Sequence, residues 1–311
     1  MTLTERVKRK ALDLGFQAVG VSRVTPDRPE AARLAEWLSR EYHGEMVWMA
    51  QTAAKRKNPA LLLPGIRSIV SVGMNYYTDD RPDDAPGRGR IARYARGEDY
   101  HRVLGERLES LASFLQAEAP DSRSLAYVDT GAVMEKAWAQ RAGLGWIGKH
   151  SNLVSGQYGS WLLLGEVLTT ADLFPDEPGA DLCGTCTLCI KACPTGAITE
   201  PYVVDARRCL SYLTIEQKGN IPDEFQASLG NYIFGCDECL DVCPYNHQAT
   251  PTTEQAFRAT SLTLNPDLDA LARQSASEFH AAFRSSPIRR TGHEGLRRSV
   301  AVARKNSRGA S

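Results

Sequence analysis

The first 182 residues of this 311-residue chain contain no cysteine, and no part of the chain contains a long apolar run. A helix that spans a bilayer needs about 20 mostly apolar residues, so the sequence predicts no transmembrane segment and no membrane partner. The opening stretch, MTLTERVKRKALDLG, lacks both the apolar core of a secretion signal and a twin-arginine motif. We therefore expect a cytoplasmic protein.

The chain also lacks an excess of charge of either sign, with 37 Lys and Arg residues against 37 Asp and Glu residues. This balance excludes a wholly basic nucleic-acid coat but not a local basic patch. Apolar residues make up 42% of the sequence and charged residues 24%, which excludes a mostly disordered chain, a collagen-like fibre and a coiled coil. The length is about twice that of an ordinary domain, so we expect at least two domains.

All the cysteines of the chain lie in one segment, and their spacing indicates a metal cofactor. A tight cluster in a chain without an export signal favours metal binding over disulfides. Four of the eight follow the spacing C-x2-C-x2-C-x3-C before a proline: Cys183, Cys186, Cys189, Cys193 and then Pro194. This is the spacing of bacterial ferredoxins, in which three thiolates bind one 4Fe–4S cluster and the fourth binds a second cluster.

A second cysteine run supplies the ligands that a second cluster needs. Cys236, Cys239 and Cys243 precede Pro244 with the spacing C-x2-C-x3-C-P, but Ile233 stands where the run would have its first cysteine. Cys209 is the remaining cysteine, and we assign it the missing thiolate. The crossed ferredoxin pattern then gives two sets of ligands, the first being Cys183, Cys186, Cys189 and Cys243 and the second Cys193, Cys209, Cys236 and Cys239.

Structural zinc is the alternative to these clusters, because paired C-x2-C is also zinc spacing. Zinc, however, has no need of two C-x3-C-P runs in one segment. We therefore predict two 4Fe–4S clusters. Clusters of this kind pass single electrons and do not carry out group chemistry unaided, so the substrate chemistry is expected elsewhere in the chain.

The remaining sequence predicts an α/β or α+β domain ahead of the cysteines. Periodic apolar residues predict helices over 4–14, capped by Thr4, and over 30–42 and 100–118. Nearly continuous apolar runs predict strands over 16–24, 68–76, 124–129 and 160–168 with both faces covered. A Pro-rich acidic linker at 173–181 leads into the cysteine module, and the chain after 244 has a polar, helical pattern. We expect domains over 1–175, 176–248 and 249–311.

Two features of the large domain could carry chemistry, and each has a structural alternative. The segment GLGWIGK (143–149) contains G-x-G-x-x-G, but it follows a predicted helix over about 132–142, and His150 stands where a P-loop needs Ser or Thr. A glycine-rich loop that ends a helix is therefore favoured over a nucleotide site. Asp129 ends a buried strand, where it is either a helix cap or a partly desolvated acid with a raised pKa that donates a proton.

Positive charge is concentrated in two places. Residues 86–97 contain Arg88, Arg90, Arg93 and Arg96 and no acid, a pattern that usually marks a solvated face. Residues 284–311 contain eight Lys and Arg residues and one acid, a net charge of +7. Such segregation favours a polyanionic partner, because binding phosphates releases counterions. A disordered basic tail is the alternative.

Taken together, these motifs resemble the epoxyqueuosine reductases, a family of cobalamin-dependent iron–sulfur enzymes of tRNA modification. The resemblance rests on RYARGEDYH, VDTGAVMEKAWAQRAGLGWIGKHSNL, GSWLLLGE, CLSYLTIEQKG and both cysteine runs, and it covers about residues 1–300. The family removes the epoxide oxygen of epoxyqueuosine at the tRNA wobble position and leaves queuosine. The resemblance implies an α+β fold: a cobalamin-binding α/β sandwich domain, a ferredoxin-like two-cluster module and a short helical C-terminal segment.

The resemblance also implies roles for particular residues. Asp129 occupies the position of the family's proton donor, and the glycine-rich segment and GSW would line the corrinoid pocket, where close approach of the cofactor to the backbone explains the glycines. The implied cofactor contacts are Arg56, Tyr94, Asp99, His101, Lys149, Ser151, Asn152, Ser160 and Trp161. The implied partners are a tRNA carrying epoxyqueuosine and an external low-potential electron donor, and we expect a monomer.

One departure and two alternatives remain. Longer members of the family end in helical HEAT-like repeats, whereas this chain stops about where the first such repeat would be completed. We therefore expect weaker tRNA binding that depends more on the basic C-terminal segment. A corrinoid reductive dehalogenase would share the cofactors, but those enzymes usually carry a twin-arginine signal and have no use for a basic tail. A ferredoxin-type electron-transfer protein without its own substrate would leave the first 175 residues without a role.

Overall fold

The computed structural model describes residues 1–26, 28–83 and 85–309. Its centre is a four-stranded sheet in the order β1-β2-β7-β4, in which every neighbouring pair is antiparallel. The strands are β1 (Ala18–Arg23), β2 (Ser68–Asn75), β7 (Leu162–Thr169) and β4 (Ser124–Tyr127). All eight residues of β2 are buried, which explains the nearly continuous apolar runs in the sequence.

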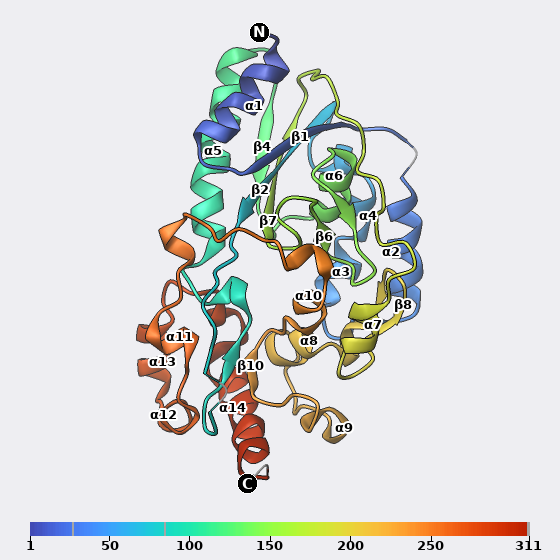
Figure 1. Ribbon diagram of the computed structural model, residues 1–311. Coiled ribbons are helices and arrows are strands. Elements are labelled where there is room, and N and C mark those ends of the chain that lie inside the picture. The colour runs from blue at the N-terminus through green and yellow to red at the C-terminus, as the bar shows by residue number, and fades with distance from the viewer. Residues whose placement is uncertain (27, 84, 310–311) are drawn as a thin grey trace.

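Helices cover both faces of this sheet (Figure 1). On one face, α1 (Leu3–Asp13) and α5 (Tyr100–Glu118) pack Val7 and Leu108 against Val70 and Val167. On the other face, Trp138 of α6 (Glu135–Arg141) packs against residues of β2 and β7. The predicted α+β class, with both faces of the strands covered, is therefore confirmed.

The start of α1 differs from its prediction. Thr2, not Thr4, is the N-cap, and it forms a capping box with Glu5 in which each side chain accepts a hydrogen bond from the other's backbone N–H. The hydroxyl of Thr4 accepts a hydrogen bond from the backbone of Phe174 instead, at 2.9 Å. The predicted cap was wrong by two residues because both threonines suit the position and a distant loop decides between them.

Short elements connect the sheet to its surroundings. Before α5 they are α2 (Pro29–Ser39), α3 (Val47–Gln51), α4 (Ala53–Lys57), β3 (Arg90–Ile91) and the 3-10 turns Pro59–Leu61 and Arg93–Ala95. Between α6 and β7 lies a small hairpin of β5 (Trp146–Ile147) and β6 (Leu153–Val154).

The cysteine-rich region consists of short helices and strands. They are α7 (Leu188–Ala192), β8 (Ile198–Glu200), β9 (Val203–Val204), α8 (Leu210–Ile215), α9 (Asp223–Gln226), β10 (Tyr232–Phe234) and α10 (Glu238–Asp241). The two cysteine runs include the short helices α7 and α10, and a separate apolar cluster around Leu210, Leu213 and Leu229 packs beside Cys209 and Cys236.

The C-terminal region has its own apolar core. It contains α11 (Ser261–Leu264), α12 (Leu268–Arg273), α13 (Ala276–Ala282) and α14 (Gly292–Gly309). Leu296 and Val300 of α14 are buried with Phe279, and the same cluster includes Ile91 and Phe234. Strand β3 pairs in parallel with β10. A segment of the first half of the chain therefore packs with the cysteine-rich and C-terminal regions.

The predicted domain limits 1–175, 176–248 and 249–311 stay predictions, and the last two residues of the third domain lie outside the described residues. Among the helices that the structure describes, none is both long and apolar enough to cross a membrane.

Candidate active site

Asp129 lies just beyond the end of β4 in a strained turn. Its φ of 50° is in the left-handed region, which a residue with a side chain seldom adopts. The side chain is 61% exposed. Its carboxylate accepts a short hydrogen bond from the Tyr100 hydroxyl and lies 3.5 Å from His101 Nε2. It does not cap α6, whose N-cap is Met134 without a side-chain hydrogen bond, so the helix-cap alternative is wrong.

The first turn of α5 supplies the partners of Asp129. Asp99 caps this helix by accepting a hydrogen bond from the backbone of His101 at 3.1 Å, and the same carboxylate oxygen lies 2.7 Å from His101 Nδ1. The ring of His101 stacks on Tyr100 with centroids 4.1 Å apart. His101 is therefore held between two carboxylates, one on each ring nitrogen.

This arrangement determines where a proton resides. Partial burial lowers the pKa of His101, but hydrogen bonds to Asp129 and Asp99 and their negative charges outweigh it and raise that pKa to about 9. Partial desolvation raises the pKa of Asp129, yet the hydrogen bonds from His101 and Tyr100 bring it below the usual value. The raised pKa expected for Asp129 is therefore wrong: in this state the acidic proton belongs to His101.

Arg56, on α4, fixes the loop that carries Asp129. Its guanidinium is buried and donates hydrogen bonds to the carbonyls of Val133, at 2.7 Å, and Gly131, at 3.1 Å. It also lies over the ring of Trp48, 5.3 Å from the centroid. Because both acceptors belong to the turn between β4 and α6, Arg56 positions Asp129 through the backbone.

Two further aromatic and cationic side chains complete the surroundings. Tyr94 meets Tyr100 edge to face at 6.1 Å and so extends the aromatic wall beside Asp129. Lys136 donates hydrogen bonds to the Ser151 carbonyl, at 3.1 Å, and to Asn152 Oδ1, at 2.8 Å. Of the contacts implied by the resemblance, Arg56, Tyr94, Asp99 and His101 surround the Asp129 turn, and Lys136 connects Ser151 and Asn152 to it.

Two of the other implied contacts, Lys149 and Ser160, hydrogen-bond segments next to the cysteines, whereas Trp161 lies in the core. Lys149 Nζ donates to the carbonyls of Gly184 and Cys186, at 2.6 and 2.9 Å. The backbone of Ser160 donates to Asn246 Oδ1 at 2.6 Å. Trp161 is buried and packs against Tyr76 and Tyr77.

Two of the glycines at 143–148 are needed because the chain passes close to itself. A Cβ on Gly145 would lie 2.1 Å from the Val154 carbonyl oxygen, and a Cβ on Gly143 would lie 2.7 Å from that of Glu177. Close crossing of the chain with itself therefore requires these glycines. This agrees with the predicted helix-ending loop, since Gly143 follows α6 with a φ of 79°, and the expected approach of a cofactor to this loop stays a prediction.

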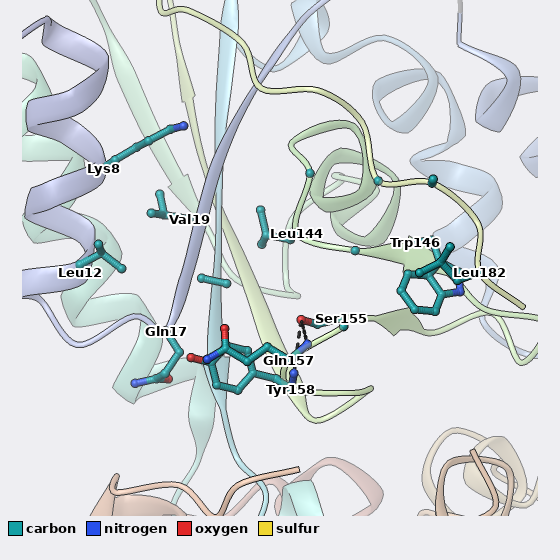
Figure 2. Close-up of a pocket in the computed structure, with 16 residues that line it drawn as sticks. Lys8, Leu12, Gln17, Val19, Leu144, Trp146, Ser155, Gln157, Tyr158 and Leu182 are labelled. Carbon is teal, nitrogen blue, oxygen red and sulfur yellow. Dashed lines mark hydrogen bonds between the residues drawn. The ribbon is translucent and has the colours of Figure 1, made fainter. Parts of the chain in front are cut away.

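A cavity of about 680 Å³ lies between α1, β1 and this glycine-rich loop (Figure 2). Leu12, Val19, Leu144, Trp146 and Tyr158 are among the residues that line it. Asp129 and the residues around it are not, so this cavity is separate from the Asp129 site.

The cysteines form two electrostatic groups. Burial raises the pKa of Cys189 and Cys243, and the thiols of Cys183 and Cys186 raise it further. Burial likewise raises the pKa of Cys239 above its usual range, and here the contributing thiols are Cys209, Cys236 and Cys193. These are the memberships that the spacing predicts, and the ligand assignment itself stays a prediction. Within the described residues, no three His, Cys, Asp or Glu side chains close around a single metal ion.

Comparisons with known proteins agree on one family. Residues 56–130 match the family profile "Epoxyqueuosine reductase QueG, DUF1730", and residues 182–246 match "4Fe-4S double cluster binding domain". The epoxyqueuosine reductase of Synechocystis sp. is 46% identical over 278 residues, which are 89% of this chain and 96% of that protein. The enzyme of Escherichia coli is 41% identical over 309 residues, or 98% of this chain and 81% of that protein. This chain belongs to the epoxyqueuosine reductase family.

Solved structures of epoxyqueuosine reductases share the fold over nearly the whole chain. A selenomethionine-labelled epoxyqueuosine reductase superposes with a TM-score of 0.92 at 33% identity, covering 99% of this chain and 82% of that one. A second crystal structure, described as containing an epoxyqueuosine-modified tRNA-Tyr stem loop, gives a TM-score of 0.93 at 34% identity over the same shares. Family membership decides against the dehalogenase and the free-standing ferredoxin as alternatives.

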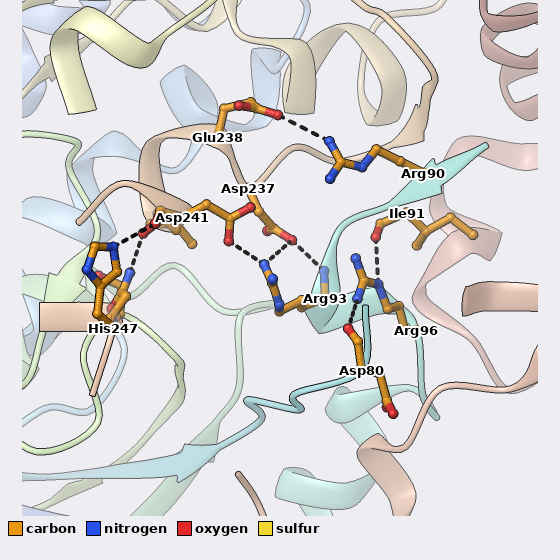
Figure 3. Close-up of polar contacts among 12 residues, drawn as sticks. Asp80, Arg90, Ile91, Arg93, Arg96, Asp237, Glu238, Asp241 and His247 are labelled. Carbon is orange, nitrogen blue, oxygen red and sulfur yellow. Dashed lines mark hydrogen bonds and ion pairs between the residues drawn. The ribbon is translucent and has the colours of Figure 1, made fainter. Parts of the chain in front are cut away.

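In this member of the epoxyqueuosine reductase family, arginines of residues 86–97 form contacts within the fold instead of a solvated face. The backbone N–H of Arg93 donates to Asp237 at 2.7 Å, and its guanidinium lies 2.5 Å from Asp241, so it connects the RYARGEDYH motif to α10 between the cluster cysteines (Figure 3). Arg96 donates to the Ile91 and Asp80 carbonyls. The solvated face predicted for this run is therefore wrong at these positions.

The basic C-terminal segment is also folded. Arg290 forms a two-point ion pair with Glu216 at 2.9–3.0 Å, and Arg298 donates to the carbonyls of Leu213, Gln217 and Gly219. The disordered-tail alternative is therefore wrong within residues 284–309. Arg284 and Arg289 stay exposed, and the charge of Arg289 acts on Asp99, which brings positive charge to the rim of the site.

Reasoning from sequence missed Tyr100 and Lys136 as site residues. Both lie within the motifs that carried the resemblance, next to Asp99 and within the helix that follows Asp129. Both residues lie in the first turn of a predicted helix. Because side chains there point toward the preceding loop, this position could have indicated that they belong to the site.

Proposed function

We propose that this chain reduces epoxyqueuosine in tRNA to queuosine, with Asp129 as the group that protonates the departing epoxide oxygen. One observation carries the proposal beyond family membership: an exposed carboxylate in a strained turn lies 3.5 Å from the Nε2 of a histidine whose pKa is about 9. At neutral pH this histidine is protonated, so the site holds an acidic proton at the surface that a substrate can reach.

Conversion of an epoxide to an alkene consumes two electrons and two protons and releases water. The eight thiols suit two 4Fe–4S clusters because they fall into two sets of four that influence one another. The aromatic wall of Tyr94, Tyr100 and His101 suits a flat corrinoid, and Lys136 is within electrostatic range of both Asp129 and Cys239. When bound and reduced, cobalamin supplies the low-potential reactivity toward carbon, and the clusters relay electrons from an external donor.

The chain's own residues handle the proton. Asp99 orients the His101 ring through Nδ1, which directs Nε2 at Asp129. As the substrate covers Asp129, lost hydration raises the pKa of its carboxyl, and the proton moves from His101 Nε2 to Asp129 Oδ2 and on to the leaving oxygen. Arg56 keeps the turn in place during this transfer through the Gly131 and Val133 carbonyls.

A solved structure of the Bacillus subtilis enzyme is described as having an aspartate catalytic loop swung out of the active site. In the present chain, the hydrogen bonds of Tyr100 and Arg56 favour the inward position of the Asp129 turn. We infer that Asp129 is the equivalent acid and that its turn opens and closes around the tRNA base. A tRNA substrate implies a reaction in the cytoplasm.

The test is turnover by the fully loaded protein. After anaerobic reconstitution with iron, sulfide and cobalamin, the chain is mixed with a low-potential reductant and tRNA carrying epoxyqueuosine. Nucleoside mass spectrometry should show loss of epoxyqueuosine and formation of queuosine, and omission of cobalamin is the control. A loaded protein that leaves epoxyqueuosine intact would refute the proposed function.

A further inference from the structure

The interior beneath α6 contains a carboxyl group that the mechanism above does not use. Glu166 lies in the middle of β7 and is completely buried. Neither of its carboxyl oxygens has a hydrogen-bond partner among the described residues. An ionised carboxylate in such a place loses its hydration without compensation, which is so unfavourable that the group takes up a proton instead.

Among the neighbours of Glu166 on the sheet, only the Ser71 hydroxyl opposes the rise of its pKa. The strand register places it opposite Ser71 of β2 on one side and Tyr127 of β4 on the other. The hydroxyl of Ser71 is buried and has no hydrogen-bond partner of ordinary geometry, and the same is true of Ser22 on β1. Ser71 and Glu166 are thus a polar pair across β2 and β7, and Ser22 lies opposite Ile69, two residues away from Ser71 along β2.

A second carboxyl faces the same layer. Glu135 is the first residue of α6, the helix that packs on β7, and one of its oxygens is buried without a partner. The charged groups around the two glutamates are Arg56 from α4, Asp129 from the preceding turn and Lys136 from α6 itself.

Neither nearby cation neutralises the pair. Arg56 directs its guanidinium to the carbonyls of Gly131 and Val133, and Lys136 directs its ammonium to Ser151 and Asn152. Desolvation and mutual repulsion therefore disfavour the state in which both carboxyls are ionised.

The pKa values of Glu166 and Glu135 are both raised. Burial raises the pKa of Glu166 well above its usual range, and the charge of Glu135 adds to the rise. Burial also raises the pKa of Glu135, to about 7, with a further contribution from Asp129 and an opposing one from Arg56. Asp129 thus acts on both glutamates.

We propose that the half-buried Glu135 and the buried Glu166 form a carboxyl pair that stores a proton and returns it to Asp129 during each turnover. This rests on the proposed function. Each deoxygenation delivers two protons to one oxygen, and His101 holds one of them. In the second transfer the pair loses a proton and becomes singly more negative, the Asp129 carboxylate becomes a carboxylic acid, and no electrons move. The half-buried Glu135 then regains a proton from solvent.

The segment that separates Asp129 from the carboxyl pair is short, and Arg56 holds it in place. Asp129 and Glu135 stand at the two ends of the turn that Arg56 holds by its carbonyls. No direct hydrogen bond joins them among the described residues, so the proposed transfer needs an intervening hydrogen-bonding group such as a water molecule. Glu135 and Glu166 are therefore positioning and supply residues, whereas Asp129 touches the substrate.

Infrared difference spectroscopy of the cluster-loaded full chain tests the store independently of turnover. At pH 7 the wild type should show the carbonyl stretch of a protonated carboxyl, and Glu166→Gln should lose it. Glu109→Gln, at an exposed position of α5, is the matched control and should keep it. Absence of the band in the wild type, or its persistence in both Glu166→Gln and Glu135→Gln, would overturn the proposal.

Turnover as a function of pH gives the second arm. Glu166→Gln should lower kcat about tenfold or more at pH 8 and less at pH 6, where solvent protons replace the store. Glu166→Asp keeps a titratable group and should recover most of the wild-type profile, which a purely structural role would not predict. An unchanged profile in Glu166→Gln overturns the store. An inactive wild type with the infrared band present overturns the proposed function instead, and the two failures are thereby distinguished.

Discussion

His101 Nε2 lies 3.5 Å from Asp129 Oδ2, although the two residues come from opposite ends of neighbouring elements, the start of α5 and the end of β4. The contact forms because α5 packs along β4 and β7 in the sheet core. It leaves the carboxylate ionised and the imidazole protonated, so the acid that meets the substrate and the acid that holds the proton at rest are different residues.

Replacing Asp129 by Asn should nearly abolish turnover. The amide has the size of the carboxyl but carries no transferable proton, so we expect kcat to fall by about 10²–10⁴-fold, the usual contribution of general acid catalysis. Iron content, the cobalamin spectrum and the melting temperature should stay close to those of the wild type. Near-normal formation of queuosine by this variant would show that another group is the acid.

The His101 interaction should make stability depend on pH. The folded-state pKa of His101, about 9, exceeds its usual value of 6.5, so its contribution is complete below about pH 6.5 and is lost as the pH rises through 9. Urea unfolding of the wild type and of His101→Gln should therefore differ most at pH 6 and least at pH 10. A difference that is constant over this range would mean that the ring is neutral in the folded state.

Arg56→Lys should release the Asp129 turn without removing the charge. A lysine cannot donate to the carbonyls of Gly131 and Val133 in the same fork geometry. We expect faster amide hydrogen exchange across residues 129–134 and a fall in kcat larger than any change in the binding of cobalamin. Lys55→Ala, an exposed neighbour on α4, is the control, and equal exchange in both variants would contradict the role of Arg56.

Anaerobically purified protein should contain about eight iron and eight sulfide per chain, as two 4Fe–4S clusters require. Cys209→Ser should then alter the electron paramagnetic resonance signal of one cluster and leave the other, because Cys209 influences Cys236 and Cys239 but is not among the thiols acting on Cys189 or Cys243. Stoichiometric zinc, or unchanged spectra in the variant, would refute the ligand assignment.

Arg289 should contribute to tRNA binding by neutralising a phosphate near the site. Arg289→Gln is expected to reduce the slope of log affinity against log salt by about 0.7–0.9, the value for one released counterion. Arg33→Gln on α2, another exposed arginine, serves as the control. Point variants are preferable to truncation here, because α14 contributes Leu296 and Val300 to a core. Equal slopes for the wild type and Arg289→Gln would show that Arg289 does not neutralise a phosphate of the tRNA.

Much of the fold was predictable because a strand that is buried on both faces of its sheet has a nearly continuous run of apolar residues. The apolar runs at 68–76 and 160–168 predicted β2 and β7 to within one or two residues at each end. The glycine-rich stretch was predicted to end a helix, and it does. The cap of α1 was misplaced, because a contact between Thr4 and Phe174 cannot be inferred from local pattern.

The spacing of the cysteines, the long apolar strands and the motifs that identify the family are visible in the sequence, since each of them is carried by residues close together along the chain. Only the tertiary structure decided the ionisation of the site. The pKa of Asp129 is lowered by His101, which lies across the packing of α5 on the sheet. Arg93, from the run predicted to be a solvated face, pairs instead with Asp237 and Asp241. A sequence shows which charged residues are neighbours along the chain. The pKa and the electrostatic free energy of each charged group, however, depend on residues that folding brings close from distant parts of the chain.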